Sequence, residues 1–206
     1  MHSSALLLAS SGAEAERIAA FCRRLFPDCT VLHGNWGEAL PQAAAEWQGD
    51  LLVSYCSRWI VPEDLLRRAR VAINFHPAPP EYPGIGGLNW AIYEGRRRFG
   101  VTCHELAPAV DSGTILEVRR FPLLESDDVP ELFRRTHLHL ECMACDIIGG
   151  MSSGEFTSSS TEEWAPTTRL RRELDAMMEV TGDMPESELE LRRRAFEFGS
   201  WKLRYA

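Results

Sequence analysis

The chain has 206 residues, of which 45% are hydrophobic and 25% charged, as in a soluble globular protein. A domain of this length buries roughly 70% of its unfolded surface, so it needs neither a disulfide nor a metal to fold. The net charge of -8 argues against a broad contact with nucleic acid or an anionic membrane. The early apolar run 5–9 is too short to span a membrane and lacks the flanks of a signal peptide. We therefore expect a cytoplasmic protein whose six cysteines are thiols.

The first half of the chain alternates short apolar runs with helical patterns, which predicts an α/β fold with a mostly parallel sheet flanked by helices. Apolar runs predict strands at 5–9, 29–33, 51–55 and 71–75. Apolar periodicity predicts helices at 13–26 and 38–47. Another helix is expected to start at Pro62, with acidic residues near its positive end. This layout is Rossmann-like.

The second half continues with a short helix at 88–94 and strands at 100–106 and 114–121. A long helix follows the capping residues 126–128, and Gly149-Gly150 is expected to end it. A serine-rich loop, 152–161, and a charged, partly helical tail interrupted at Gly182 and Pro185 come next. We divide the chain into a main domain, 1–150, and a short C-terminal appendage, 151–206.

Polar residues at the end of the strand 71–75 are the first candidates for chemistry. Asn74 and His76 are two apart, so in a strand they point to the same side. The next residues, 77–87, hold four prolines and three glycines and form a rigid loop, and ligands bind beyond the carboxyl ends of such strands. A carboxylate such as Asp111 could orient the imidazole. An amide, an imidazole and a carboxylate can stabilise an oxyanion and move a proton in acyl transfer, although an asparagine and a histidine at this spacing more often have a purely structural role.

Several motifs between about residues 51 and 123 resemble those of the folate-dependent formyltransferase family. This family includes glycinamide ribonucleotide, methionyl-tRNA and nucleotide-sugar N-formyltransferases. The motifs are Ile73-Asn74-Phe75-His76-Pro77, Tyr82-Pro83-Gly84, Trp90-Ala91-Ile92, Glu94-Gly95, Gly100-Val101-Thr102-Cys103-His104 and Val110-Asp111-Ser112-Gly113.

The resemblance implies a formyltransferase fold, with 1–150 as its catalytic domain, and roles for individual residues. Asn74, His76 and Asp111 fall on the catalytic positions of the family. The implied formyl donor is N10-formyltetrahydrofolate, and no metal is implied. The residues implied to contact this cofactor are Ser57, Arg58, Trp59, Ile60, His104, Leu106 and Val110. Those expected to bind the acceptor substrate are Tyr82, Gly84, Ile85, Gly86, Gly87 and Asn89.

The acceptor amine is less defined by these motifs. The loop 76–84 resembles the nucleotide-sugar branch, which favours a nucleotide-linked amino sugar. The 55 residues after Met151 are not net basic, unlike the added domain of the methionyl-tRNA branch. In glycinamide ribonucleotide enzymes the first turn binds the substrate phosphate. The corresponding turn here, 10–14, contains the carboxylate of Glu14, which disfavours that substrate. Another small amine, such as an amino acid, a natural-product precursor or glycinamide ribonucleotide itself, is the alternative.

Other interpretations compete with formyl transfer. A formyltetrahydrofolate hydrolase would use similar groups. Such hydrolases are similar to this chain in their catalytic part but carry an added N-terminal domain, which disfavours this interpretation. A folate-binding module without activity is disfavoured because Asn74, His76 and Asp111 are all present. The run from His137 to Cys145 contains zinc-type ligands, but we interpret it as a thiol-bearing core face of a helix. The arginine-rich tail could form a homodimer contact or pack against its own domain.

Overall fold

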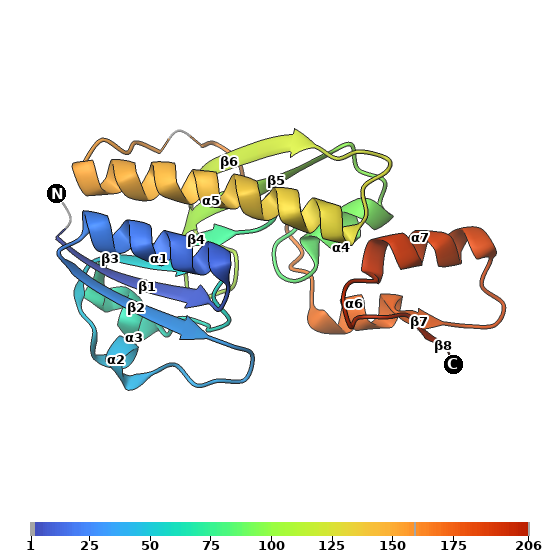
Figure 1. Ribbon diagram of the computed structural model, residues 1–206, viewed down its shortest axis with the longest axis horizontal. Coiled ribbons are helices and arrows are strands. Elements are labelled where there is room, and N and C mark those ends of the chain that lie inside the picture. The colour runs from blue at the N-terminus through green and yellow to red at the C-terminus, as the bar shows by residue number, and fades with distance from the viewer. Residues whose placement is uncertain (1–2, 159, 206) are drawn as a thin grey trace.

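The computed structural model describes residues 3–158 and 160–205, with a six-stranded sheet at its centre (Figure 1). The strand order is β2-β1-β3-β4-β5-β6. Parallel pairing joins β2 (Asp28–Gly34), β1 (Ser4–Ser10), β3 (Gly49–Tyr55) and β4 (Ala69–His76). Antiparallel pairing adds β5 (Arg98–Glu105) and β6 (Ile115–Pro122). The predicted Rossmann-like fold is confirmed, as a mixed sheet with a parallel half.

Helices cover both faces of this sheet (Figure 1). The helices α1 (Ala13–Leu25) and α5 (Val129–Ser153) pack on one face, and the shorter α2 (Gln42–Glu46) and α3 (Glu63–Arg68) lie on the other. Successive strand residues point to opposite faces, so Leu7 enters the core beneath α1 and α5 whereas Leu6 and Leu8 enter the core beneath α2 and α3. Burial on both faces explains why the parallel strands read as continuous apolar runs.

Two predicted helix boundaries are wrong. The helix expected at 38–47 begins only at Gln42, directly after Pro41, because a proline disfavours helical backbone at the residue before it. The long helix does not stop at Gly149-Gly150 but runs through Met151 to Ser153. A helical glycine costs about 1 kcal/mol relative to alanine, and the burial of Ile147, Ile148 and Met151 outweighs this cost. Its end is Gly154, with a left-handed φ of +80°.

The region beyond α5 packs near one end of the sheet. Its elements are α6 (Arg171–Met177), β7 (Glu179–Val180), α7 (Glu186–Phe196) and β8 (Arg204–Tyr205). The predicted break at Gly182 and Pro185 is confirmed, and the serine-rich stretch, of which residue 159 lies outside the described residues, is irregular from residue 155 onward. The helix α4 (Gly87–Tyr93) packs against α7, where the Asn89 amide donates to the Ala195 carbonyl at 2.7 Å. Within the described ranges, no helix has the length and apolar character needed to cross a membrane.

Candidate active site

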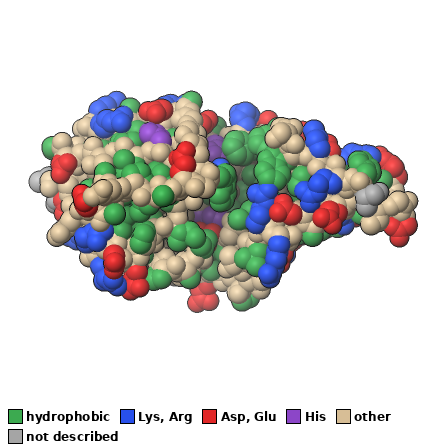
Figure 2. Space-filling view, turned by 90° about the horizontal axis from the view of Figure 1, so that it is seen from below, with side chains coloured by type: hydrophobic (Ala, Val, Ile, Leu, Met, Phe, Trp, Pro, Cys, Tyr) green, Lys and Arg blue, Asp and Glu red, His purple; other side chains and the backbone are tan. Residues whose placement is uncertain are grey.

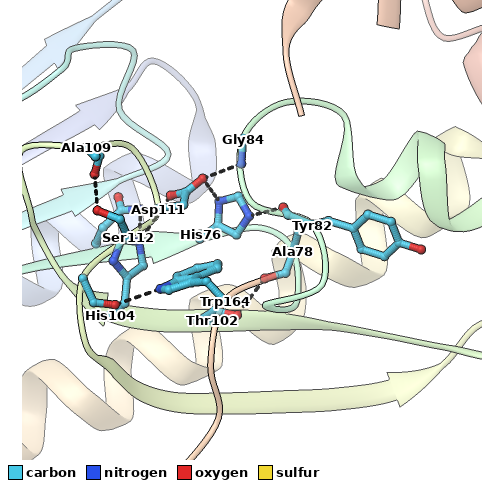
Figure 3. A network of polar contacts seen from close by, with 12 residues as sticks. His76, Ala78, Tyr82, Gly84, Thr102, His104, Ala109, Asp111, Ser112 and Trp164 are labelled. Carbon is cyan, nitrogen blue, oxygen red and sulfur yellow. Dashed lines mark hydrogen bonds and ion pairs between the residues drawn. The ribbon is translucent and has the colours of Figure 1, made fainter. Parts of the chain in front are cut away.

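The predicted amide, imidazole and carboxylate come together at the end of β4. Figure 3 shows the His76 imidazole beside the Asp111 carboxylate. Nδ1 of His76 lies 3.3 Å from Oδ2 of Asp111, and both residues are less than 9% exposed. Asp111 sits in the turn between β5 and β6 with a φ of +46°, a left-handed conformation that aspartate tolerates because of its short polar side chain. The tertiary structure thus joins two segments that are 35 positions apart in the sequence.

Strand pairing brings a second histidine into this cluster. Antiparallel register places His104 of β5 opposite Asn74 of β4. Nε2 of His104 lies 3.0 Å from the Asn74 amide nitrogen and 3.3 Å from Oδ1 of Asp111. Its Nδ1 faces the Glu105 carbonyl at 2.7 Å and therefore carries a hydrogen. Nε2 accepts from the amide when the ring is neutral and donates to the carboxylate when the ring is charged.

Both ring nitrogens of His76 are occupied. Its Nε2 lies 2.9 Å from the carbonyl oxygen of Tyr82 and donates to it, because that oxygen can only accept. Nδ1 faces Asp111. In this arrangement His76 directs no N–H toward a ligand, so contact with a ligand oxygen requires the imidazole to leave the Tyr82 carbonyl. No motif in the sequence indicated that the Tyr82 carbonyl would accept this hydrogen bond.

The protonation of the pair follows from burial and mutual contact. Burial lowers the pKa of His76 below that of an ordinary histidine, although Asp111 and the Tyr82 carbonyl favour the charged ring. Burial alone would raise the pKa of Asp111, but the contacts with His76, His104 and the Gly84 amide hold this pKa below its ordinary value. Asp111 is therefore ionised at neutral pH, and His76 releases a proton readily.

Two glycines allow the backbone to approach this cluster. The Gly84 amide donates to Oδ2 of Asp111 at 2.7 Å, and its φ is +93°. A Cβ at Gly84 would lie 2.2 Å from the Arg169 carbonyl oxygen. A Cβ at Gly113 would lie 1.9 Å from the Glu105 carbonyl oxygen. The proline- and glycine-rich loop and the Asp111 turn are therefore both shaped by close contacts that only glycine permits.

A cavity of about 840 Å³ opens beside these groups, and on the face shown in Figure 2 the molecule is hollowed near its middle, with histidine side chains in the hollow. Asn74, His76 and Asp111 line the cavity. It is also lined by every residue expected to contact the cofactor, namely Ser57, Arg58, Trp59, Ile60, His104, Leu106 and Val110. The residues predicted to be catalytic and those predicted to contact the cofactor thus line the same cavity.

Trp59 and some of the residues expected to bind the acceptor make contacts within the protein itself. The Trp59 indole donates to the Glu38 carbonyl at 3.0 Å and packs against Gly34 in the core beneath α2 and α3, so its ring has a structural function. Of the residues expected to bind the acceptor, Gly84, Ile85 and Gly86 line the cavity, but Tyr82, Gly87 and Asn89 do not. The Tyr82 hydroxyl instead donates to Glu94 at 2.7 Å.

The structure adds residues to the site that the motifs did not indicate. Phe133 and His137 on α5 line the cavity, and Trp36 lies on its wall with the Arg58 guanidinium 4.9 Å from its ring centre. The Phe133 side chain is 37% exposed although it is apolar. Trp164, from the irregular stretch after α5, contacts both His76 and His104. Its isolated position in a polar segment was the one feature of the sequence that could have indicated a place in the site.

The histidines and cysteines of α5 point in different directions. His137 packs against Phe133 with ring centres 4.1 Å apart, whereas His139 stacks on Phe121 at 4.3 Å. Cys142 is exposed, so the predicted thiol-bearing core face is wrong for this residue. Among residues 3–158 and 160–205, no three His, Cys, Asp or Glu side chains are grouped to hold a metal ion.

Comparison with known proteins identifies the family. A family model described as formyl transferase matches residues 32–143, which is more than half of the chain. The chain therefore belongs to the formyl transferase family. A methionyl-tRNA formyltransferase from Enterococcus faecalis is 30% identical over 110 residues, which cover 52% of this chain and 35% of that protein. The chain thus matches about a third of this relative's length.

Solved structures share the fold over nearly the whole chain. A sugar N-formyltransferase from Shewanella sp. FDAARGOS_354 superposes with a TM-score of 0.78 at 17% identity, covering 99% of this chain and 93% of that one. An N-formyltransferase from Helicobacter canadensis, solved in complex with folinic acid and dTDP-3-aminofucose, gives a TM-score of 0.77 at 16% identity, covering 94% and 80%. These likenesses establish the fold.

Proposed function

We propose that this protein transfers a formyl group from N10-formyltetrahydrofolate to a primary amine, most specifically that of a nucleotide-linked amino sugar. The observation that carries the proposal is the cluster of Asn74, His76 and Asp111 beside one large cavity, with the carboxylate 3.3 Å from the imidazole. Membership of the formyl transferase family supports the same reaction class.

Asn74 supplies the donor to the reacting carbonyl in this proposal. Its amide has two hydrogens, of which one is directed to Nε2 of His104. Because Asn74 lines the cavity, we assign the second to a ligand oxygen. A preorganised donor of this kind typically lowers a barrier by about 2.7–4 kcal/mol.

Proton transfer falls to His76 and Asp111. Attack by a neutral amine leaves a proton to be removed, and the low pKa of buried His76 makes its neutral form available at neutral pH. The ionised Asp111 then faces the charged imidazole at 3.3 Å and stabilises it. The pair thus accepts the proton of the attacking amine, and the same proton passes to N10 of the folate as the bond between the formyl carbon and N10 breaks and tetrahydrofolate leaves.

The cavity fits a reduced folate in size and chemistry. Drug-sized ligands occupy pockets of roughly 300–1,000 Å³, and this cavity measures about 840 Å³. Flat apolar surface is offered by Trp36 and Val110, and the exposed Ile60 adds to it. When bound, N10-formyltetrahydrofolate supplies the formyl carbon. The Helicobacter canadensis protein was solved with folinic acid, which supports a folate ligand for this fold.

An amino sugar linked to a nucleotide is the acceptor we favour. The dTDP-3-aminofucose in the Helicobacter canadensis complex supports it, as does the similarity to the Shewanella sugar N-formyltransferase. A smaller amine without phosphate groups is the second candidate. It is favoured by the charges on the cavity wall, where Arg58 is the one arginine or lysine among the lining residues, against the carboxylates of Glu14 and Asp111.

The test is incubation of the purified protein with N10-formyltetrahydrofolate and a panel of amines, followed by mass spectrometry. The panel holds dTDP- and UDP-linked amino sugars, free amino sugars, amino acids and glycinamide ribonucleotide. We expect one nucleotide-linked amino sugar to gain a formyl group. Formylation of a free amine alone would select the second candidate, and formate release without any acceptor would identify a hydrolase. A protein that consumes no donor in any reaction would refute the proposal.

A further inference from the structure

A tryptophan from a remote part of the chain contacts both histidines of the site (Figure 3). The Trp164 ring lies edge to face with His104, with centres 4.9 Å apart and planes at 86°, and with His76 at 5.7 Å and 75°. Its indole N–H donates to the Gly113 carbonyl at 2.8 Å. Gly113 is two residues after Asp111, so one side chain touches both imidazoles and the turn that carries the carboxylate.

The backbone around Trp164 is fixed to the proline- and glycine-rich loop. We call residues 164–169 the strap. The strap's Ala165 amide donates to the Pro80 carbonyl at 2.9 Å, and its Arg169 amide donates to the Pro83 carbonyl at 2.8 Å. In return the Ile85 amide donates to the Arg169 carbonyl at 3.0 Å. These bonds attach the strap on both sides of Gly84, whose amide binds Asp111.

A side-chain cluster anchors the far end of the strap. The Arg169 guanidinium forms an ion pair with Glu94 at 2.9 Å and lies 4.4 Å from the centre of the Trp90 ring. Glu94 also accepts from the Tyr82 hydroxyl, and the Tyr82 carbonyl is the acceptor for His76. The strap is therefore connected to the catalytic cluster by Trp164 at one end and through Tyr82 at the other.

We propose that Trp164 is a positioning residue: it keeps the His76 imidazole facing Asp111, as proton transfer requires, and the His104 imidazole against Asn74 and Asp111. This inference rests on the proposed function. Trp164 is not among the residues that line the cavity, so it acts through the two imidazoles and not on a ligand. Edge-to-face contacts restrict ring orientation, and the hydrogen bond to Gly113 fixes the indole itself. Ordinary packing of a half-buried tryptophan would contribute stability without this catalytic effect.

Kinetics of two substitutions separate positioning from packing. Trp164→Leu removes the ring and the N–H, and we expect it to lower kcat by roughly ten- to one-hundredfold, because misplaced catalytic groups cost up to about that factor. The KM of donor and acceptor should change less than about twofold, because the cavity wall is untouched. Trp164→Phe keeps a ring and should recover most of kcat. The control is Trp201→Leu, since Trp201 is also on the C-terminal region but stacks with Arg171. A Trp164→Leu enzyme with wild-type kcat would overturn the proposal.

Nuclear magnetic resonance of the histidine ring protons tests the same contact without any reaction. An aromatic ring shifts the signals of protons close to it, so Trp164→Leu should move the signals of His76 and His104, two of the six histidines. Trp201→Leu should move neither. If Trp164→Leu does not fold, the spectrum of Trp164→Phe tests the contact instead, and we expect smaller shifts of the same two histidine signals. Unmoved signals refute the inference. A wild-type protein that transfers no formyl group refutes only the proposed function, because the spectrum still reports the contact.

Discussion

Replacing Asp111 by asparagine removes one negative charge from the centre of the site and keeps the shape of the side chain. The carboxylate accepts from the Gly84 amide at 2.7 Å and lies 3.3 Å from each of His76 and His104. Asparagine can still accept from Gly84 through its own carbonyl oxygen. It also tolerates the left-handed backbone, with φ of +46°. The substitution therefore affects mainly the two imidazoles.

The expected effects on stability and on turnover differ in size. In Asp111→Asn one buried hydrogen bond is weakened, so the free energy of unfolding should fall by about 0.5–1.5 kcal/mol. Asp111→Ala should cost more, because it leaves the Gly84 amide without an acceptor, at about 1–3 kcal/mol, and places alanine in left-handed backbone, at about 1–2 kcal/mol. Turnover of Asp111→Asn should fall by about 100- to 1,000-fold, as for the loss of other preorganised electrostatic groups.

Formylated product measured by mass spectrometry gives kcat, and urea unfolding gives stability. Both are compared with Ser112→Ala, a neighbouring change that removes a hydroxyl donating to the Ala109 carbonyl at 2.9 Å and that should keep wild-type turnover. An Asp111→Asn enzyme within tenfold of wild-type kcat would show that the charge is not needed for proton transfer. A loss of stability as large as that of Asp111→Ala would contradict the assignment of the Gly84 contact.

Four further outcomes follow from the same geometry. Asn74→Ala should lower kcat by roughly 100-fold with an unchanged circular dichroism spectrum, and undiminished turnover would remove its assigned role. The pKa of His76, followed by nuclear magnetic resonance, should lie below the ordinary value and fall further in Asp111→Asn, because that change removes the charge that favours the protonated ring. Because this pKa is lower in the folded than in the unfolded chain, neutral His76 contributes stability above about pH 6.5. That stability should be lost as the pH falls through this value toward the pKa of the folded chain. A free energy of unfolding that stays constant across this window would contradict the shift in pKa. Gly84→Ala, with its Cβ 2.2 Å from a strap carbonyl, should lower the urea midpoint more than Gly95→Ala, which has a similar positive φ and open space. Equal midpoints would refute the close contact.

Strand positions and one pair of site residues could be predicted from local sequence. A strand buried on both faces must be apolar throughout, so β1 and β3 are visible as short runs without any knowledge of their neighbours. The period of two along β4 places Asn74 and His76 on one side, and the structure has both in the wall of one cavity. Asp111 was predicted from its motif, since spacing alone does not indicate that its turn folds back on β4.

Helix ends were less predictable because they depend on a balance of small terms. The pattern at 38–47 is helical in its apolar spacing, but Pro41 delays the start to Gln42. Gly149 and Gly150 favour a stop, yet three buried side chains near the end of α5 keep the helix intact to Ser153. At the end of α5 a local preference of about 1 kcal/mol per glycine competes with packing that only the folded chain provides.

Apolar periodicity and motifs are properties of neighbouring residues, so they were enough to predict the α/β fold, the strand that carries Asn74 and His76, and the family. Which groups meet in the site depends on the folded chain. His104 reaches Asn74 through antiparallel register, the Tyr82 carbonyl occupies Nε2 of His76, and Trp164 lies against both imidazoles after a return of the chain from α5. Contacts between residues so far apart follow from how layers pack and loops close, and no local pattern encodes them.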